Sequence, residues 1–192
     1  MEKKLGIFIA RMNPPHKGHM KIIKKILKEN DYALIFIGSS EKNDELNPLN
    51  SQERENIIKQ NLKNHFENNT IKTILLNDEE TDKKWIDTIK KEFDTFSGNL
   101  FSETTFYGGD LENDYAIQVI KNFEKELPFE KISYKEISRK NSFISFDGKK
   151  YAISGTQIRT LWKEKNITII EKMLEKNMQK DIISLLRKYE DK

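Results

Sequence analysis

Short apolar runs alternate with longer amphipathic stretches along most of the chain. Five apolar runs have the length of a strand: residues 5–10, 32–37, 71–76, 104–107 and 131–137. Four intervening stretches repeat their apolar residues every three or four positions, as a helix with one buried face does: 17–30, 51–65, 82–96 and 112–126. Strands that alternate with helices build βαβ units, so the pattern predicts an α/β fold with a doubly wound, Rossmann-like parallel sheet.

The last part of the chain departs from this alternation. Residues 143–146 and 150–153 flank Asp147-Gly148, a dipeptide typical of the tight turn in a β-hairpin. A helix is expected from about residue 155, and apolar residues at helical spacing continue over 167–189. Because there is no internal repeat or low-complexity linker, we expect residues 1–192 to form one domain with a helical C-terminal part, about 155–192.

Composition narrows the classes of partner. The net charge is only +3 and is spread evenly among 34% charged residues, which argues against a nucleic-acid partner. The chain has no cysteine, which excludes disulfides and thiolate metal sites. The N-terminal apolar run is too short for a signal peptide or a membrane span. We therefore expect a cytoplasmic protein with no membrane partner.

Two of the three histidines lie at the turn between the first strand and the first helix. His16 and His19 are three residues apart, so they share one face of the first helical turn. Free N–H groups and the positive end of the helix dipole point the same way, and Gly18 would let a phosphate approach the backbone. The alternative is a pair of polar residues at a solvated helix start. We favour an anion site.

A resemblance sharpens this hypothesis. The pattern His-x-Gly-His after a first strand resembles the signature of the nucleotidyltransferase superfamily. The longer run 11–19, Arg-Met-Asn-Pro-Pro-His-Lys-Gly-His, is similar to archaeal-type nicotinamide mononucleotide (NMN) adenylyltransferases. Ala10, Asn13 and Pro15 depart from the Gly, Gln and Phe that are usual there, so the acceptor is less certain than the chemistry. Nicotinic acid mononucleotide, phosphopantetheine or a sugar or alcohol phosphate stay open as acceptors.

The second motif of that superfamily, Ser-x-Thr-x-Ile/Val-Arg, resembles the run Ser154-Gly155-Thr156-Gln157-Ile158-Arg159. Ser154 and Thr156 are natural N-caps whose hydroxyls and neighbouring N–H groups can bind phosphate, with Arg159 one turn further on. A capped helix with a surface arginine is the alternative for this segment taken by itself.

Residues for the acceptor come mainly from the resemblance. Ser39, in Gly-Ser-Ser, and Arg54, which ends Asn-Pro-Leu-Asn-Ser-Gln-Glu-Arg, match a pair of family segments that place Arg54 near the nucleotide phosphates. Asp78 and Trp85 match a family Asp and Trp seven residues apart, which implies that they frame the nicotinamide ring. Without the resemblance, Arg54 would be interpreted as a surface residue and Trp85 as a core residue.

The fourth apolar run ends in Gly108-Gly109-Asp110, where a backbone without side chains could pass close to a ligand. The segment 108–115 vaguely resembles NMN adenylyltransferases that are fused to Nudix hydrolases. Asp110, Glu112 and Asp114 could hold a metal, but acidic residues at a helix start usually complement the dipole, and we favour that interpretation.

The resemblance implies an enzyme that transfers AMP from ATP to NMN, giving NAD and pyrophosphate, with Mg²⁺ carried by the triphosphate and no metal site of the protein's own. It also implies a homo-oligomer. The expected catalytic residues are His16, His19, Arg11 and Arg159. The expected ATP-binding residues are Ile9, Ala10, Arg11, Met12, His16, Gly18, His19, Gly108, Ser154, Gly155, Thr156 and Arg159. The expected NMN-binding residues are Asn13, Ser39, Arg54, Asp78 and Trp85. A non-catalytic nucleotide-binding regulator is the alternative of another class.

Overall fold

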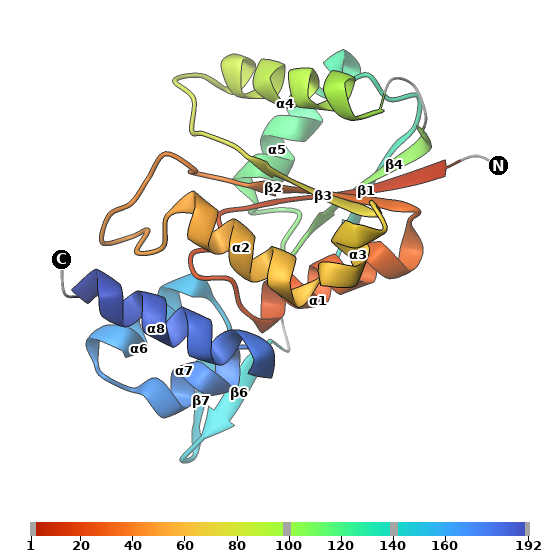
Figure 1. Ribbon diagram of the computed structural model, residues 1–192. Helices are drawn as coiled ribbons and strands as arrows, with labels where there is room; N and C mark the ends of the chain where they lie inside the picture. Colours follow the sequence, from red (N-terminus) through yellow and green to blue (C-terminus); the bar gives the residue numbers. More distant parts are fainter. Residues whose placement is uncertain (1–2, 98–100, 139–141, 191–192) are drawn as a thin grey trace.

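A five-stranded parallel sheet forms the centre of the computed structural model, which describes residues 3–97, 101–138 and 142–190 (Figure 1). The strands are β1 (Lys3–Ala10), β2 (Tyr32–Ile37), β3 (Ile71–Leu75), β4 (Phe101–Gly108) and β5 (Ile132–Glu136). Their order is β3-β2-β1-β4-β5, so the chain runs outward to one edge and then restarts on the other side of β1. The predicted doubly wound sheet is confirmed, and its strand order reverses between β1 and β4, where such sheets bind ligands.

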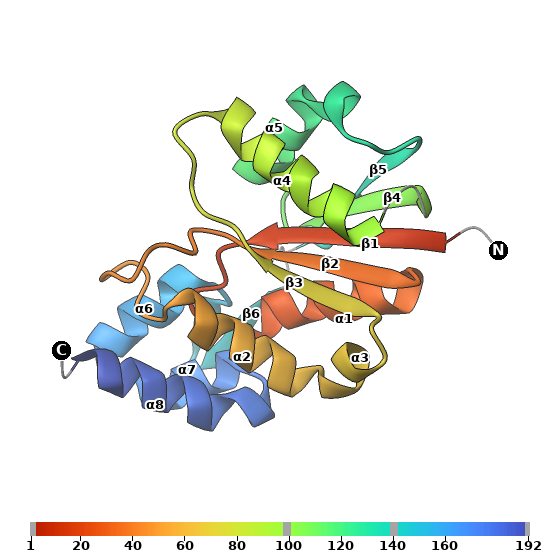
Figure 2. The same ribbon diagram turned by 45° about the horizontal axis from the view of Figure 1, so that its top comes forward.

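Helices cover both faces of the sheet. The helices α1 (Lys17–Glu29), α2 (Ser51–Asn61) and α3 (Lys63–Glu67) lie on one face, and α4 (Asp82–Ser97) and α5 (Tyr115–Asn122) lie on the other (Figures 1 and 2). Alternate residues of β1 belong to the two cores, since Phe8 packs with the α1 and α2 side and Ile7 with the α4 and α5 side. Burial on both faces explains why the strands are continuous apolar runs.

Several element boundaries differ from the prediction. The expected helix 51–65 is divided at Leu62 into α2 and α3. Asn50, not Ser51, caps α2, and it forms a capping box with Glu53. The expected helix 112–126 begins only at Tyr115, because the Asp110 carboxylate accepts hydrogen bonds from the Glu112 and Asn113 N–H groups and holds a turn. Glu124–Glu126 then form a short 3₁₀ helix, η1.

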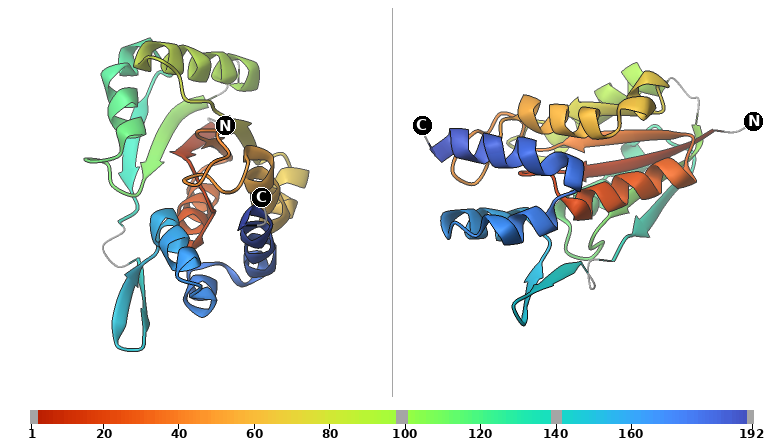
Figure 3. Two further views of the ribbon diagram at one scale, coloured as in Figure 1. Left: turned by 90° about the vertical axis from the view of Figure 1, so that its left-hand side faces the viewer. Right: turned by 60° about the horizontal axis from the view of Figure 1, so that its bottom comes forward.

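The C-terminal part packs against α1 and α2. A hairpin of β6 (Phe143–Phe146) and β7 (Lys149–Ala152) projects away from the sheet (Figure 3), and Asp147 and Gly148 both have positive φ angles, as the predicted turn requires. The helices that follow are α6 (Gly155–Lys163), α7 (Ile167–Met173), the 3₁₀ helix η2 (Lys176–Met178) and α8 (Gln179–Glu190). Their apolar residues share one core cluster with α1 and α2. No helix in the described ranges is long and apolar enough to cross a membrane.

Candidate active site

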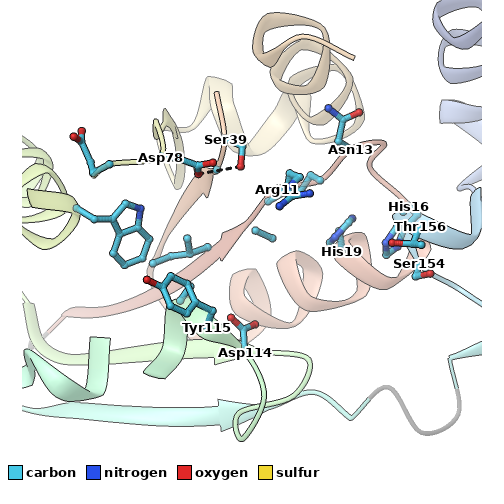
Figure 4. Close-up of a pocket in the computed structure, with 18 of the residues that line it drawn as sticks. Arg11, Asn13, His16, His19, Ser39, Asp78, Asp114, Tyr115, Ser154 and Thr156 are labelled. Atoms are coloured by element: carbon cyan, nitrogen blue, oxygen red, sulfur yellow. Dashed lines mark hydrogen bonds between the residues drawn. The ribbon is translucent and has the colours of Figure 1, made fainter. Parts of the chain in front are cut away.

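A cavity of about 550 Å³ lies at the carboxyl ends of the strands, where β1 meets the loops after β2, β3 and β4 (Figure 4). The start of α1 and the start of α6 complete its wall, so the two sequence motifs meet although they are far apart in the chain. The predicted site residues that line it are Ile9, Ala10, Arg11, Met12, Asn13, His16, His19, Ser39, Asp78, Trp85, Ser154, Gly155, Thr156 and Arg159. Gly18, Arg54 and Gly108 are not among them.

The histidine pair is rigidly packed. The His16 and His19 rings stack with their centroids 3.7 Å apart, and the centroid of Phe8 lies 6.1 Å from that of His19. The two residues are 6% and 9% exposed. His16 is the N-cap of α1, and its Nδ1 accepts a hydrogen bond from the Gly18 N–H at 3.1 Å, which assigns the imidazole proton to Nε2. Nε2 of His16 therefore carries the ring proton and is the donor side of the imidazole.

Gly18 and Gly108, which do not line the cavity, each leave room for a neighbouring side chain. A Cβ at residue 18 would lie 2.9 Å from Cε1 of His16, so this glycine makes room for the histidine ring. A Cβ at residue 108 would lie 3.0 Å from Leu111 and 3.4 Å from Ile117. Gly108 thus allows the loop after β4 to fold back onto α5, and its backbone does not line the cavity.

Arg54 lies beneath the cavity instead of in it. Its side chain is fully buried, and its guanidinium donates to the carbonyl of Arg11 at 2.5 Å, of Gly38 at 2.8 Å and of Ser39 at 3.1 Å. Met12 (φ 53°) and Ser39 (φ 48°) adopt left-handed backbone conformations, which are strained for residues other than glycine. Arg54 therefore holds both strained turns, at the ends of β1 and β2, in place.

The second motif is joined to the first by Arg159. Its Nη1 donates to the Asn13 carbonyl at 2.6 Å and its Nη2 donates to Oγ1 of Thr156 at 3.2 Å. A Cβ on Gly155 would lie 2.9 Å from that same Asn13 carbonyl, so only glycine allows α6 to start this close to the first motif. The Ser154 hydroxyl caps α6 by accepting from the Gln157 N–H at 3.1 Å, as predicted.

Positive charge gathers at this end of the cavity. Burial lowers the pKa of Arg159, and the neighbouring charge of Arg11 lowers it further. The same two causes lower the pKa of Arg54 to about 10. The lowered pKa of Arg159 means that its charged form is disfavoured beside Arg11, so an anion bound next to these two cavity-lining arginines would be stabilised. A polyphosphate satisfies this requirement.

The Asn13 amide is committed to the fold although the residue lines the cavity. Its Nδ2 donates to the Leu49 carbonyl at 2.7 Å, and its Oδ1 accepts from the Leu49 N–H at 3.1 Å. This reciprocal pair ties the first motif to the loop before α2. Both atoms of the Asn13 amide are therefore bonded to the protein's own backbone rather than directed at a ligand.

At the other end of the cavity, Ser39 and Asp78 lie together (Figure 4). The Ser39 hydroxyl donates to Oδ1 of Asp78 at 3.0 Å, and Lys42 pairs with Oδ2. Burial raises the pKa of the Asp78 carboxyl, but the hydrogen bonds from Lys42 and Ser39 outweigh it and lower the pKa below its ordinary value. Trp85 of α4 lines this end as well.

Sequence reasoning missed several lining residues. They are Gly38, Glu79, Thr81, Asp82, Tyr115 and Ala116, which come from the ends of β2 and β3 and the starts of α4 and α5. Asp114, considered only as a helix-dipole partner, is the N-cap residue of α5 and lines the cavity too. That dipole interpretation does not extend to Asp110 and Glu112, which lie in the loop before the helix.

In the described ranges, no three His, Asp or Glu side chains come together in an arrangement that could hold a metal ion. The oxygen-rich groups of a triphosphate are the ligands that Mg²⁺ prefers, and it commonly keeps several waters as well.

The reversed strand order, the histidine pair at a helix start and the convergent arginines define a nucleotide-binding α/β domain. The chain belongs to the cytidylyltransferase-like family, whose model matches residues 7–161. Among curated relatives, the nicotinamide-nucleotide adenylyltransferase of Methanococcus maripaludis strain C5 is 34% identical over 118 residues, 59% of this chain and 66% of that protein. The protein of the same name from strain C6 is 27% identical over 169 residues, 88% of this chain and 89% of that protein.

Solved structures share the fold at lower identity. A bifunctional NMN adenylyltransferase/ADP ribose pyrophosphatase from Francisella tularensis superposes with a TM-score of 0.69 at 21% identity. The match covers 99% of this chain and 50% of that chain, so this chain spans half of the bifunctional protein. A NadR protein in complex with NAD and AMP-PNP has a TM-score of 0.57 at 21% identity, over 84% of this chain and 43% of that one.

Proposed function

We propose that this protein is a nicotinamide-nucleotide adenylyltransferase, which transfers AMP from ATP to NMN and releases pyrophosphate. The observation that carries the proposal is the convergence of both motifs on one cavity, through the hydrogen bond from Arg159 to the Asn13 carbonyl. The curated relatives of that name support the choice of reaction, because one of them aligns with 88% of this chain. Asp78 and Trp85, at the opposite end of the cavity, support NMN as the acceptor.

The chemistry requires no nucleophile from the protein. A 5′-phosphate oxygen of NMN attacks the α-phosphorus of ATP in line, the bond to the bridging oxygen breaks, and pyrophosphate leaves with that electron pair. Negative charge builds on the α-phosphate and leaving β-phosphate oxygens, so fixed hydrogen-bond donors lower the barrier. We assign Nε2 of His16 and the His19 imidazole to these oxygens. Arg11, Arg159 and the start of α6 hold the β- and γ-phosphates.

A divalent cation is part of the proposal. Mg²⁺ bound to the triphosphate would neutralise charge on the leaving pyrophosphate. A Francisella tularensis structure of the bifunctional protein was determined with AMP and a Mn ion, which supports the use of a divalent ion by that protein. The homo-oligomeric state and the cytoplasmic location stay predictions.

The test is an assay of the purified protein with ATP, Mg²⁺ and NMN, in which NAD and pyrophosphate are both measured. We expect them to form in equal amounts. His65→Ala is a suitable control for variants of the other two histidines, because His65 lies on α3 and bonds Thr70, away from the cavity. Tight ATP binding with no dinucleotide from NMN would contradict the proposal and favour a regulator or another phosphorylated acceptor.

A further inference from the structure

A second recess opens beside the cavity, between α6 and the loop after β2 (residues 38–50), which Figure 2 shows next to each other. It has a volume of about 340 Å³ and is lined by Glu45, Leu46, Thr156, Arg159, Thr160, Lys163 and Glu164. Thr156 and Arg159 line the main cavity as well, so the recess continues the cavity beyond the second motif. The recess therefore begins at the groups to which we assign the β- and γ-phosphates.

One side of α6 presents hydrogen-bond donors to the recess. Thr156, Arg159 and Lys163 are three or four residues apart, so they lie along the same side of the helix. Arg159 is partly committed to the fold, because its Nη1 and Nη2 donate to the Asn13 carbonyl and to Oγ1 of Thr156. Lys163 adds an ammonium group one turn further along, outside both sequence motifs. Its three N–H donors suit the oxygens of a phosphate group.

The opposite wall of the recess presents a carboxylate to that ammonium group. Glu45 forms an ion pair with Lys163, which is 118 residues away in the sequence. The Asp44 carboxylate accepts hydrogen bonds from the N–H groups of Leu46 and Asn47, both at 2.9 Å, so Glu45 lies at the tip of a fixed turn. The hydrogen bond from Lys163 lowers the pKa of the Glu45 carboxyl, which is therefore charged at neutral pH.

The ion pair between Glu45 and Lys163 can be exchanged for another contact. The Lys163 side chain is 62% exposed and the Glu45 side chain is 71% exposed. Ion pairs this exposed stabilise a protein little, because water and salt screen them. A terminal phosphate group carries more negative charge than a carboxylate and offers three oxygens, so it can displace Glu45 from the ammonium group.

We propose that the recess binds the terminal phosphate group of the triphosphate through Lys163, and that Glu45 competes with this phosphate for the ammonium group. This inference rests on the proposed function and adds two residues that neither motif contains. Binding of the triphosphate breaks the ion pair, and its re-formation lowers the affinity for the pyrophosphate product. Because both residues act on one contact, loss of the Lys163 charge weakens ATP binding, whereas loss of the Glu45 charge strengthens it.

The experiment compares the Kd values of ATP and of ADP, each with Mg²⁺, by calorimetry at low ionic strength. ADP lacks the terminal phosphate, so the ratio of the two Kd values isolates the contact in the recess. In Lys163→Met, ATP binding should weaken roughly 5- to 10-fold, while ADP binding should change less than about two-fold. In Glu45→Gln, ATP binding should strengthen roughly 2- to 5-fold, because the competing charge is lost.

Lys24→Met is the matched control. Lys24 pairs with Glu175 at 2.9 Å, an ion pair that also joins distant segments of the chain, and it lines neither the cavity nor the recess. Its Kd values for ATP and ADP should match those of wild type. Lys163→Arg keeps the positive charge and should bind ATP within about 3-fold of wild type. Thermal unfolding of each variant shows whether it is folded at the assay temperature.

A ratio of the ATP and ADP Kd values that Lys163→Met leaves unchanged would overturn the inference. Unchanged or weaker ATP binding in Glu45→Gln would overturn it too, because neither result is compatible with competition for the ammonium group. Both measurements are made without turnover. Absence of NAD formation by the wild-type protein, which would contradict the proposed function, is therefore a separate result.

Discussion

The two ends of the cavity are built in different ways: the basic end lies at the starts of α1 and α6, and the acceptor end lies at the loop after β3 and the starts of α4 and α5. At the basic end, His16, His19 and Arg159 are largely buried or held by backbone groups, and Gly155 allows the second motif to approach closely. At the acceptor end, half-buried Asp82 and Trp85 of α4 and exposed Tyr115 of α5 project from the starts of two helices. A transition state whose charge develops at fixed atoms requires rigid donors, whereas a flat ring can be recognised by faces and by net charge. Under the proposed function, this difference assigns the chemistry to the basic end and the choice of acceptor to the other end.

The largest effect should come from removing a donor at the basic end. His19→Ala should lower kcat by roughly 10² to 10³, the cost of losing one preorganised hydrogen bond to a developing charge. The KM for NMN should change little, because NMN binds at the other end. Steady-state kinetics with His65→Ala as the control measures this. Turnover within a few-fold of wild type would exclude the assigned role.

Variants of Arg54 test whether the turns after β1 and β2 depend on the guanidinium group that lies beneath them. Arg54→Ala leaves the carbonyls of Arg11, Gly38 and Ser39 without their donor and should lower the free energy of unfolding by about 3 kcal/mol. Arg54→Lys should rescue only part of this, since one ammonium group cannot span three carbonyls. Urea unfolding gives the stability.

If Arg54 only positions the two turns, KM should rise for ATP and NMN together in Arg54→Lys. A rise confined to NMN would instead show that the guanidinium contacts the mononucleotide, as the family resemblance implied. The two outcomes separate a positioning role from a binding role.

Two glycines offer a matched comparison of local strain. In Gly155→Ala the new methyl group would meet the Asn13 carbonyl, so α6 must shift, and KM for ATP should rise roughly 10-fold. In Gly148→Ala nothing lies within 4 Å of the new methyl group, but the residue has φ 73°, so stability should fall by about 1 kcal/mol. Its KM values should match wild type. If Gly155→Ala has the same KM for ATP as Gly148→Ala, the close approach of α6 to the first motif is not needed for ATP binding.

The smallest effect should come from Lys42 at the acceptor end. The pKa of Asp78 is lowered in the folded protein, so its stabilising contribution is present above the ordinary pKa of 3.8 and is lost as the pH falls through the lowered value. In Lys42→Met, burial is opposed only by the Ser39 hydrogen bond and the charge of Arg11, so the pKa of Asp78 should rise. The acid limb of the kcat/KM profile for NMN should move to higher pH, with less than about a two-fold change at neutral pH. An unshifted acid limb would separate Asp78 from acceptor binding.

Features that depend on residues close together in the sequence could be predicted from the sequence. Hydrophobic periodicity predicted the parallel sheet and its helices, since burial on one face or both leaves a local period. The Asp147-Gly148 turn and the Ser154 cap were also predictable, because each depends on the backbone of a few neighbouring residues. The predicted helix starts were wrong where the side chain of Asp110 or Asn50 accepts a hydrogen bond from a backbone N–H group, because hydrophobic periodicity carries no information about such bonds.

The sequence by itself determined the fold class, the two phosphate motifs and the residue types that they present. Only the tertiary structure decided that Arg54 supports the cavity from beneath, that Gly18 makes room for His16, and that Tyr115 faces the acceptor end through its bond to Asp82. The physical reason is range. A motif within one turn is set by local geometry, whereas these three roles depend on where a side chain's own partners lie, and for Arg54 and Tyr115 the partners are on other elements of the fold.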